Sequence, residues 1–179
     1  MKNKKTILDI TYIACFSALI AVCAWITIPG PVPFTLQTFA VFTALGLLGG
    51  KRGTLSVFIY ILLGAAGVPV FANFGGGIGV LLGSTGGYII GFLFSALFIW
   101  IVTNLFGDKT VVLAGAMFVG LIICYLFGTA WFMVVFTRAN SAITFGATLM
   151  KCVVPFVIPD LLKISLALLI SKRLKKAIK

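Results

Sequence analysis

The sequence predicts an all-α integral membrane protein that consists of a single transmembrane domain over residues 1–179. Hydrophobic residues make up 61% of the chain, and its mean hydropathy is +1.23. Charged residues make up only 9%, whereas roughly a quarter is typical of soluble domains. The apolar residues also fall in runs that suit membrane-spanning helices. These features exclude a soluble protein and leave room for about six membrane crossings.

Proline, glycine and charged clusters divide the chain into six apolar runs, because a helix that faces lipid does not continue through them. The first run stops at Pro29 and the second at the charged turn Lys51-Arg52. The second and third runs are short, so we expect interfacial turns to extend them or protein to surround them. The fourth and fifth runs stop at charged turns, and the sixth begins at Pro159, a favourable first residue of a helix. The predicted spans are about 8–28, 34–49, 54–66, 86–106, 111–136 and 159–172.

Residues 67–85, between the third and fourth spans, are too apolar for a solvated loop and too rich in glycine for a helix. Irregular backbone at membrane depth is tolerated only where protein buries it or where it lines a cavity. We therefore expect a re-entrant or capping segment beside a binding site, and a flexible external loop is the alternative. A second irregular stretch, 139–158, is expected to form a short interfacial helix over 142–152.

The distribution of lysine and arginine predicts the orientation in the membrane. With a cytoplasmic N-terminus, only Arg138 and Lys151 of the 14 basic residues lie in external segments, and Lys163 lies within the sixth span. Cytoplasmic loops carry such an excess of basic residues, so both termini are predicted to be cytoplasmic. The basic residues are spread over several cytoplasmic ends without an aromatic groove, which excludes nucleic acid as a partner.

The inventory of reactive side chains argues against catalysis. The chain has no His, and its carboxylate side chains are those of Asp9, Asp108 and Asp160. The usual acid–base pairs and metal-ligand sets are therefore missing. Residues 46–52 also fail the pattern of a phosphate-binding loop, so the chain does not hydrolyse ATP itself. We expect no enzyme activity, no metal and no cofactor.

Asp160 and Lys163 are the ionisable side chains within the predicted sixth span. Their spacing of three residues places them on one face of the helix. Ionisable groups are costly inside a membrane and are functional candidates by default. Asp160 directly follows Pro159, so the positive end of the helix dipole also favours a carboxylate there. The alternative is a structural ion pair that joins two spans.

Further polar and aromatic side chains fall on the same external side as this pair. They belong to the second span, the Gly-rich segment, the start of the fourth span and the fifth span, and they are Thr35, Gln37, Asn73, Thr85, Tyr88 and Trp131. The two aromatic residues are candidate walls, although aromatic side chains often serve packing alone. A pocket with an ammonium, a carboxylate and amides within apolar walls suits a small, partly apolar, anionic ligand.

Two stripes of small residues permit close approach of helices. Ala14 and Ala18 lie in the cytoplasmic half of the first span, and small residues recur every four positions from Ala116 to Gly128 on the fifth. Packing inside the bundle is the favoured interpretation of such a pattern, and contact with another protein is the alternative.

Three motifs occur in order: Pro-Val-Pro-Phe-Thr-Leu-Gln-Thr at 31–38, the stretch 67–88, and Pro-Asp-Leu-Leu-Lys at 159–163. Together they resemble the BioY family, the biotin-specific substrate-binding (S) components of energy-coupling-factor (ECF) vitamin transporters. The resemblance covers nearly the whole chain and departs from the family pattern at Ser84, where proline is common. It implies a six-helix protein of the bacterial cytoplasmic membrane that captures biotin from outside. Its partners would be a transmembrane coupling (T) subunit and two cytoplasmic ATPases.

The resemblance also implies roles for individual residues. Asp160 and Lys163 would be the principal ligand contacts, with Asn73 and Tyr88 as neighbours. From charge we infer that Lys163 binds the biotin carboxylate and Asp160 the ureido N–H groups. The Ala14-x-x-x-Ala18 stripe resembles the motif that docks on the T subunit, which favours the intermolecular interpretation of that stripe.

Other functions stay open at this point. An S component for another vitamin, such as riboflavin or thiamine, would share the architecture but not these motifs, and cationic thiamine would not favour Lys163. A small integral-membrane enzyme would use Asp160 as its acid or base. A channel would need polar side chains along its whole depth, and the inner halves of the predicted spans are too apolar for that.

Overall fold

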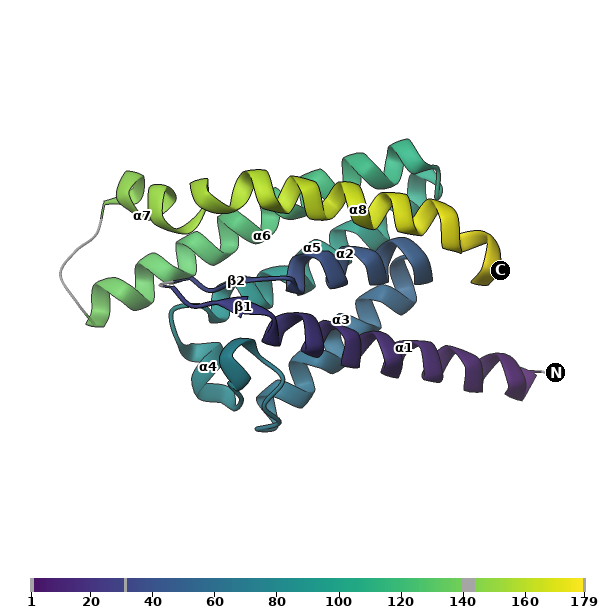
Figure 1. Cartoon of the computed structure of the whole chain (residues 1–179), viewed down its shortest axis with the longest axis horizontal. Coiled ribbons are helices and arrows are strands. Elements are labelled where there is room, and N and C mark those ends of the chain that lie inside the picture. Colours follow the sequence, from purple (N-terminus) through teal and green to yellow (C-terminus); the bar gives the residue numbers. More distant parts are fainter. Residues whose placement is uncertain (1, 31, 140–143, 179) are drawn as a thin grey trace.

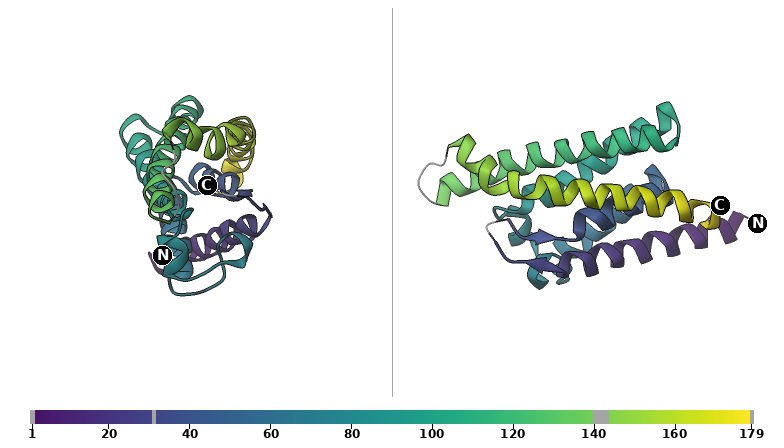
Figure 2. Two further views of the ribbon diagram at one scale, coloured as in Figure 1. Left: turned by 90° about the vertical axis from the view of Figure 1, so that its left-hand side faces the viewer. Right: turned by 45° about the horizontal axis from the view of Figure 1, so that its top comes forward.

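The computed structural model describes residues 2–30, 32–139 and 144–178, which form an elongated bundle of helices (Figure 1). The elements are α1 (Lys2–Trp25), β1 (Thr27–Ile28), β2 (Phe34–Thr35), α2 (Gln37–Leu48), α3 (Gly50–Ala65), the 3-10 helix η1 (Ala72–Phe74), α4 (Ile78–Leu82), α5 (Gly86–Phe106), α6 (Thr110–Ala139), α7 (Phe145–Cys152) and α8 (Val154–Ile178). Both termini lie at one end of the bundle, whereas the β1–β2 pair, α4 and α7 lie at the other. Figure 2 shows the same separation from a second direction.

Among the described residues, four helices are long and apolar enough to cross a membrane. They are Lys4–Trp25 of α1, Gly86–Phe106, Thr110–Thr137 of α6 and Val154–Lys175 of α8. Large apolar side chains such as Leu105, Val111 and Ile158 are exposed on these helices, which suits contact with lipid rather than water. The shorter α2 and α3 occupy the positions of the predicted second and third spans, and the count of six spans stays a prediction.

The helix α2 lies at the centre of the bundle. Nearly all of its side chains are buried, from Gln37 to Leu48, so protein surrounds this short helix as expected. Around it, α5 and α6 pack closely, because the small-residue stripe of α6 faces α5. A methyl group at Gly128 would lie 2.2 Å from the Tyr88 ring, and one at Gly120 would lie 2.6 Å from Ser95 Oγ. Ala14 and Ala18 on α1 are exposed instead.

The boundary between the first two predicted spans differs from expectation. The helix α1 ends at Trp25, and Thr27–Ile28 pairs with Phe34–Thr35 as a short antiparallel hairpin, with Thr27 opposite Thr35. Pro29 disfavours helical backbone at the residue before it, and β-branched residues favour extended backbone. The hairpin matters for the site because it places Thr35 over the buried face of the bundle.

The last helix also begins earlier than predicted. The helix α8 starts at Val154 and contains Pro159 in its interior, so Pro159 is not the first residue of the helix. Asp160 therefore lies beyond the first turn, and the argument from the helix dipole was wrong. An interior proline removes one backbone hydrogen bond, here the one to the Pro155 carbonyl. The short helix predicted over 142–152 is α7, and positions 142 and 143 lie outside the described residues.

The Gly-rich segment is partly helical, because it contains η1 and α4 between glycine turns. Asn73 and Phe74 have positive φ angles of 55° and 57°, a conformation that bulky residues rarely adopt. The segment is attached to the end of α1. Trp25 Nε1 donates to the Pro69 carbonyl at 2.8 Å, and the Trp25 ring stacks on Phe74 with centroids 5.2 Å apart. Its re-entrant position in the membrane stays a prediction.

Candidate ligand-binding site

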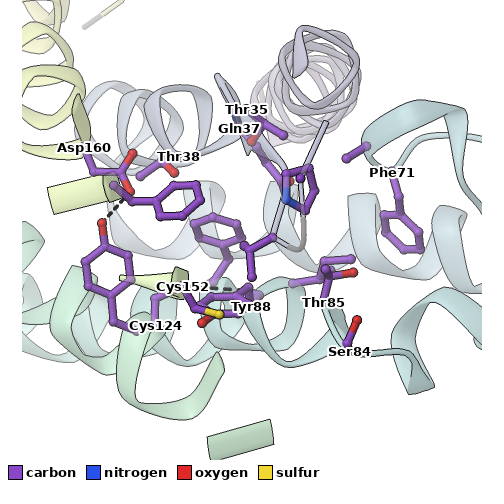
Figure 3. A pocket seen from close by; sticks show the side chains of 18 of the residues that line it. Thr35, Gln37, Thr38, Phe71, Ser84, Thr85, Tyr88, Cys124, Cys152 and Asp160 are labelled. Atoms are coloured by element: carbon purple, nitrogen blue, oxygen red, sulfur yellow. Dashed lines mark hydrogen bonds between the residues drawn. The ribbon is translucent and has the colours of Figure 1, made fainter. Parts of the chain in front are cut away.

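A cavity of about 320 Å³ lies among the hairpin, the start of α2, the Gly-rich segment and the helices α5 to α8 (Figure 3). Its volume falls within the range of about 300–1,000 Å³ that is typical of small-molecule sites. These elements gather at the end of the bundle away from the termini. The apolar part of the wall is formed by Val32, Pro33, Phe71, Val80, Ile89, Phe92, Leu121 and Phe156.

Asp160 and Lys163 form a buried ion pair in this wall, with only 4% and 6% of their surfaces exposed. Lys163 Nζ donates to Asp160 Oδ1 at 2.7 Å and to the backbone carbonyl of Thr35 at 2.7 Å. Nζ also lies 4.0 Å from the centroid of the Phe34 ring, where the π face attracts a cation. Both charged groups belong to α8, so the ion pair itself does not join two spans. The hydrogen bond from Lys163 to the Thr35 carbonyl connects α8 to β2.

Tyr125, on α6, completes this network. Its hydroxyl donates to Asp160 Oδ2 at 2.7 Å. An ionised carboxylate offers about four acceptor positions, and an ammonium offers three donors. After the contacts to Lys163 and Tyr125, Asp160 retains acceptor capacity, and Lys163 retains one donor. The network therefore fixes the positions of both side chains and leaves each of them with a hydrogen-bonding position for a ligand.

The cavity brings together most of the residues that the sequence singled out. Those that line it are Thr35, Gln37, Asn73, Thr85, Tyr88, Asp160 and Lys163. Trp131 does not line it. Its Nε1 donates to the Gly83 carbonyl at 3.0 Å, and its Cβ packs against Gly87, where a methyl group would lie 2.2 Å away. Trp131 thus holds the turn that carries Ser84 and Thr85.

Gln37 is the buried polar side chain with an unused donor in this wall. It is 5% exposed, and its Nε2 has no hydrogen-bond partner among the described residues. Its backbone N–H donates to Thr35 Oγ1 at 3.2 Å, which places Gln37 beside the strand that Lys163 contacts. A buried donor without a partner costs about 1–3 kcal/mol. A ligand acceptor in the cavity would remove that cost.

Asn73 and Tyr88 contribute in different ways. Asn73 adopts the left-handed backbone conformation that asparagine tolerates better than most residues, and this puts it on the cavity wall. The Tyr88 hydroxyl is within hydrogen-bond distance of Thr129 Oγ1, at 3.2 Å. The Tyr88 ring therefore acts as a wall while its hydroxyl is already engaged.

Several lining residues were missed at the level of sequence. Thr38 and Ser84 lie within the motifs quoted above, so their positions next to predicted contacts could have indicated them. Tyr125 and Phe156 gave no signal, because aromatic residues are frequent throughout the chain. Cys124 and Cys152 also line the cavity, and both are buried. Burial raises the pKa of the Cys152 thiol, which disfavours the reactive thiolate.

The arrangement is suited to binding. Apolar walls surround one buried cluster of donors and acceptors, as in small-molecule sites. Within the described residues, no group of three His, Cys, Asp or Glu side chains could hold a metal ion. The other two carboxylates lie elsewhere, in a salt bridge of 2.8 Å between Asp9 and Arg52 and in one between Asp108 and Lys175.

Comparison with known proteins gives one consistent result. Residues 1–179 match the family model described as the BioY family. The chain is 48% identical over 162 residues to "Biotin transporter BioY" of Thermotoga maritima. The aligned residues cover 90% of this chain and 92% of that relative. It is 42% identical over 168 residues to "Probable biotin transporter BioY" of Pyrococcus horikoshii, covering 93% of this chain and 96% of the relative.

A solved structure has the same fold. The crystal structure of the S-component for biotin from an ECF-type ABC transporter superposes with a TM-score of 0.86 and 30% sequence identity. The match covers 98% of this chain and 95% of that chain. The similarity therefore extends over both ends of the bundle and includes every element that lines the cavity.

Proposed function

Because the chain belongs to the BioY family, we propose that it is the biotin-binding S component of an ECF-type ABC transporter and takes up biotin across the cytoplasmic membrane. The observation that carries this proposal is the match over nearly the whole chain to the S-component for biotin. Its relatives are named as transporters and not as enzymes. Transport rather than catalysis is therefore the function of this chain.

The chemistry of the cavity supports biotin as the ligand. Biotin has an apolar bicyclic ring and valeryl chain, a ureido group with two N–H donors and one carbonyl acceptor, and a terminal carboxylate. The cavity offers apolar walls together with Asp160 as acceptor and Lys163 and Gln37 as donors. We infer that the ligand contacts are Asp160, Lys163, Asn73, Tyr88, Thr35, Gln37 and Thr85, with Trp131 supporting them from behind.

The arrangement of charges supports capture from the outside. Basic residues occur at the start of α1, at the α2–α3 and α5–α6 turns and in the last part of α8, namely Lys4, Lys5, Lys51, Lys109 and Lys172. Figure 1 shows these parts of the chain toward the bundle end that holds both termini. An excess of basic residues is typical of the cytoplasmic side. We therefore propose six spans, with α2 and α3 as the two short ones, cytoplasmic termini, and a cavity that faces outward beneath the Gly-rich segment as its cap.

Energy for uptake has to come from partner subunits, because the sequence has no phosphate-binding loop. The proposed partners are a T subunit and two cytoplasmic ATPases. Ala14 lies at the middle of α1 and Ala18 in the half of this helix farther from the termini, and both side chains are exposed. An exposed small-residue stripe allows a partner helix to approach closely, which supports this face of α1 as the docking surface for the T subunit.

Calorimetric titration of the detergent-purified protein with biotin tests the proposed ligand. We expect one-to-one binding that is weakened by Asp160→Asn and by Lys163→Ala. The matched control is Lys151→Ala, because Lys151 is exposed on α7 and does not line the cavity. Riboflavin and thiamine serve as control ligands. Absence of biotin binding by the folded wild type, or preference for another vitamin, would refute the assignment, and turnover of the ligand would indicate an enzyme instead.

A further inference from the structure

A second cavity, of about 540 Å³, lies at the opposite end of the bundle from the first. It is formed by the first half of α1, the α2–α3 turn, the start of α3, the end of α5 and the α5–α6 turn. Figure 1 shows these parts of the chain toward the end that holds both termini. The two cavities share no lining residue, so the capture of biotin in the first leaves the second without a role.

Contacts between three helices fix the walls of this second cavity. Arg52 Nη2 lies 2.8 Å from Asp9 Oδ1, and this ion pair joins the start of α3 to α1. Gly50 packs directly on α5, because a methyl group there would lie 2.6 Å from Trp100 Cα. The start of α3 is therefore held between α1 and α5, with its charged side chains beside the cavity.

The charged side chains of the wall do not balance. Asp9 pairs with Arg52, and Asp108 pairs with Lys175 of α8. Lys51 lines the same cavity, is exposed, and forms no ion pair within the part of the chain that the structure describes. The wall therefore carries an uncompensated positive charge. Basic residues are common near the cytoplasmic ends of spans, but that tendency does not require a cavity beside them.

One edge of the cavity is apolar and continues along α3. Leu55 belongs to the wall and is 37% exposed. Ile59 and Leu62 follow it on the same face of the helix, and both are exposed as well. A water-soluble anion would gain nothing from this strip, whereas acyl chains bury apolar surface along it. Trp100, which is partly exposed in the wall, is a residue type that is enriched at the level of lipid headgroups.

We propose that this cavity binds the headgroup of an anionic phospholipid in the membrane leaflet on the side of the termini. Lys51 neutralises the phosphodiester, and Arg52, which contacts Asp9 through Nη2 alone, retains further N–H donors for the phosphate oxygens. The amide of Asn104 in the same wall is another donor. The acyl chains lie against Leu55 and the apolar strip beyond it. In the orientation proposed above, this is the cytoplasmic leaflet, whose anionic lipids attract basic segments.

Native mass spectrometry of the detergent-purified protein tests this site with phosphatidylglycerol and phosphatidylcholine that carry the same acyl chains. Phosphatidylcholine adds a quaternary ammonium, and both carboxylates of the wall are already paired. We therefore expect the wild type to retain one phosphatidylglycerol in preference to phosphatidylcholine. Lys51→Gln should weaken the binding of phosphatidylglycerol roughly fivefold, as expected for one lysine at a membrane surface.

The matched control is Lys172→Gln, which removes another exposed lysine from the last part of α8, outside the cavity. Its lipid binding should stay within about twofold of the wild type, because solvent and salt screen a charge outside the site. Neither lysine forms an ion pair among the described residues. Both variants should therefore keep the thermal midpoint of the wild type, which shows that they are folded.

Three results would overturn the proposal. Equal weakening by both variants would indicate a diffuse basic surface, and displacement of the lipid by millimolar inorganic phosphate would indicate a site for a soluble anion. Unchanged lipid binding by Lys51→Gln, with loss of its complex with a co-expressed T subunit, would make the cavity a protein docking surface instead. The measurement needs no biotin, so its failure would leave the proposed transport function untouched.

Discussion

Replacing Tyr125 by phenylalanine isolates the hydrogen bond that holds Asp160. The Tyr125 hydroxyl donates to Asp160 Oδ2 at 2.7 Å, and the carboxylate is 4% exposed. A hydrogen bond to a charged group contributes about 1.5–3 kcal/mol. Because water cannot readily replace the lost donor in this buried position, we expect Tyr125→Phe to lower the free energy of unfolding by an amount in that range.

The matched control is Tyr60→Phe. Tyr60 is 1% exposed, and its hydroxyl has no hydrogen-bond partner among the described residues. The same chemical change therefore removes a buried polar group that contributes no hydrogen bond, and it should leave stability unchanged or raise it slightly. Denaturant titration of both variants in mixed micelles, monitored by tryptophan fluorescence, measures the difference between them.

Biotin affinity supplies the second measurement. Asp160 in the Tyr125→Phe variant has lost one of the two groups that orient its carboxylate, so we expect weaker biotin binding than in the wild type. Tyr60 does not line the cavity, and its variant should bind as the wild type does. If the two variants were equally stable and bound biotin equally well, the network at Asp160 would not be energetically significant, and the reasoning would be wrong.

Two further predictions concern helix packing and the proposed docking surface. Gly128→Ala places a methyl group 2.2 Å from the Tyr88 ring, so we expect destabilisation by about 1–3 kcal/mol and weaker biotin binding. Gly115→Ala on the same helix meets open space and should leave the thermal midpoint unchanged or slightly higher. Replacing the exposed Ala14 and Ala18 together by leucine should leave biotin binding by the isolated protein intact but abolish uptake by cells that supply the partner subunits. Normal uptake by that variant would place the docking surface elsewhere.

The sequence predicted most of the helical arrangement because glycine, proline and charge interrupt apolar runs wherever a lipid-facing helix cannot continue. It also indicated Asp160, Lys163 and Gln37, because polar side chains stand out in a chain with 9% charged residues. The motifs at 31–38, 67–88 and 159–163 led to the BioY family, and the family match confirmed it. In such an apolar chain, the rare polar residues carry most of the information about the site.

The parts that the sequence did not reveal depend on contacts between distant segments. Thr27 and Ile28 follow an apolar helix without interruption, and only their pairing with the second strand ends that helix. Proline is favourable as the first residue of a helix, and membrane helices also tolerate it in their interior, so sequence alone could not place the beginning of α8. Tyr125 acquires its role from a carboxylate 35 positions away in the chain.

The charge balance of the site bears on the ligands that it selects. The charges of Asp160 and Lys163 compensate each other, so a ligand gains little by bringing a counter-charge to either group. Selection then depends on hydrogen bonds, because a site built to bind a polar group rejects an analogue without that group by roughly 10,000- to 100,000-fold, whereas one methylene contributes about 10- to 200-fold. A fatty acid of similar length would contact the same apolar walls but leave Gln37 Nε2 and the free acceptor positions of Asp160 without partners. If biotin is the ligand, we therefore expect the hydrogen-bonding groups of the cavity, more than its apolar walls, to distinguish biotin from other small apolar carboxylates.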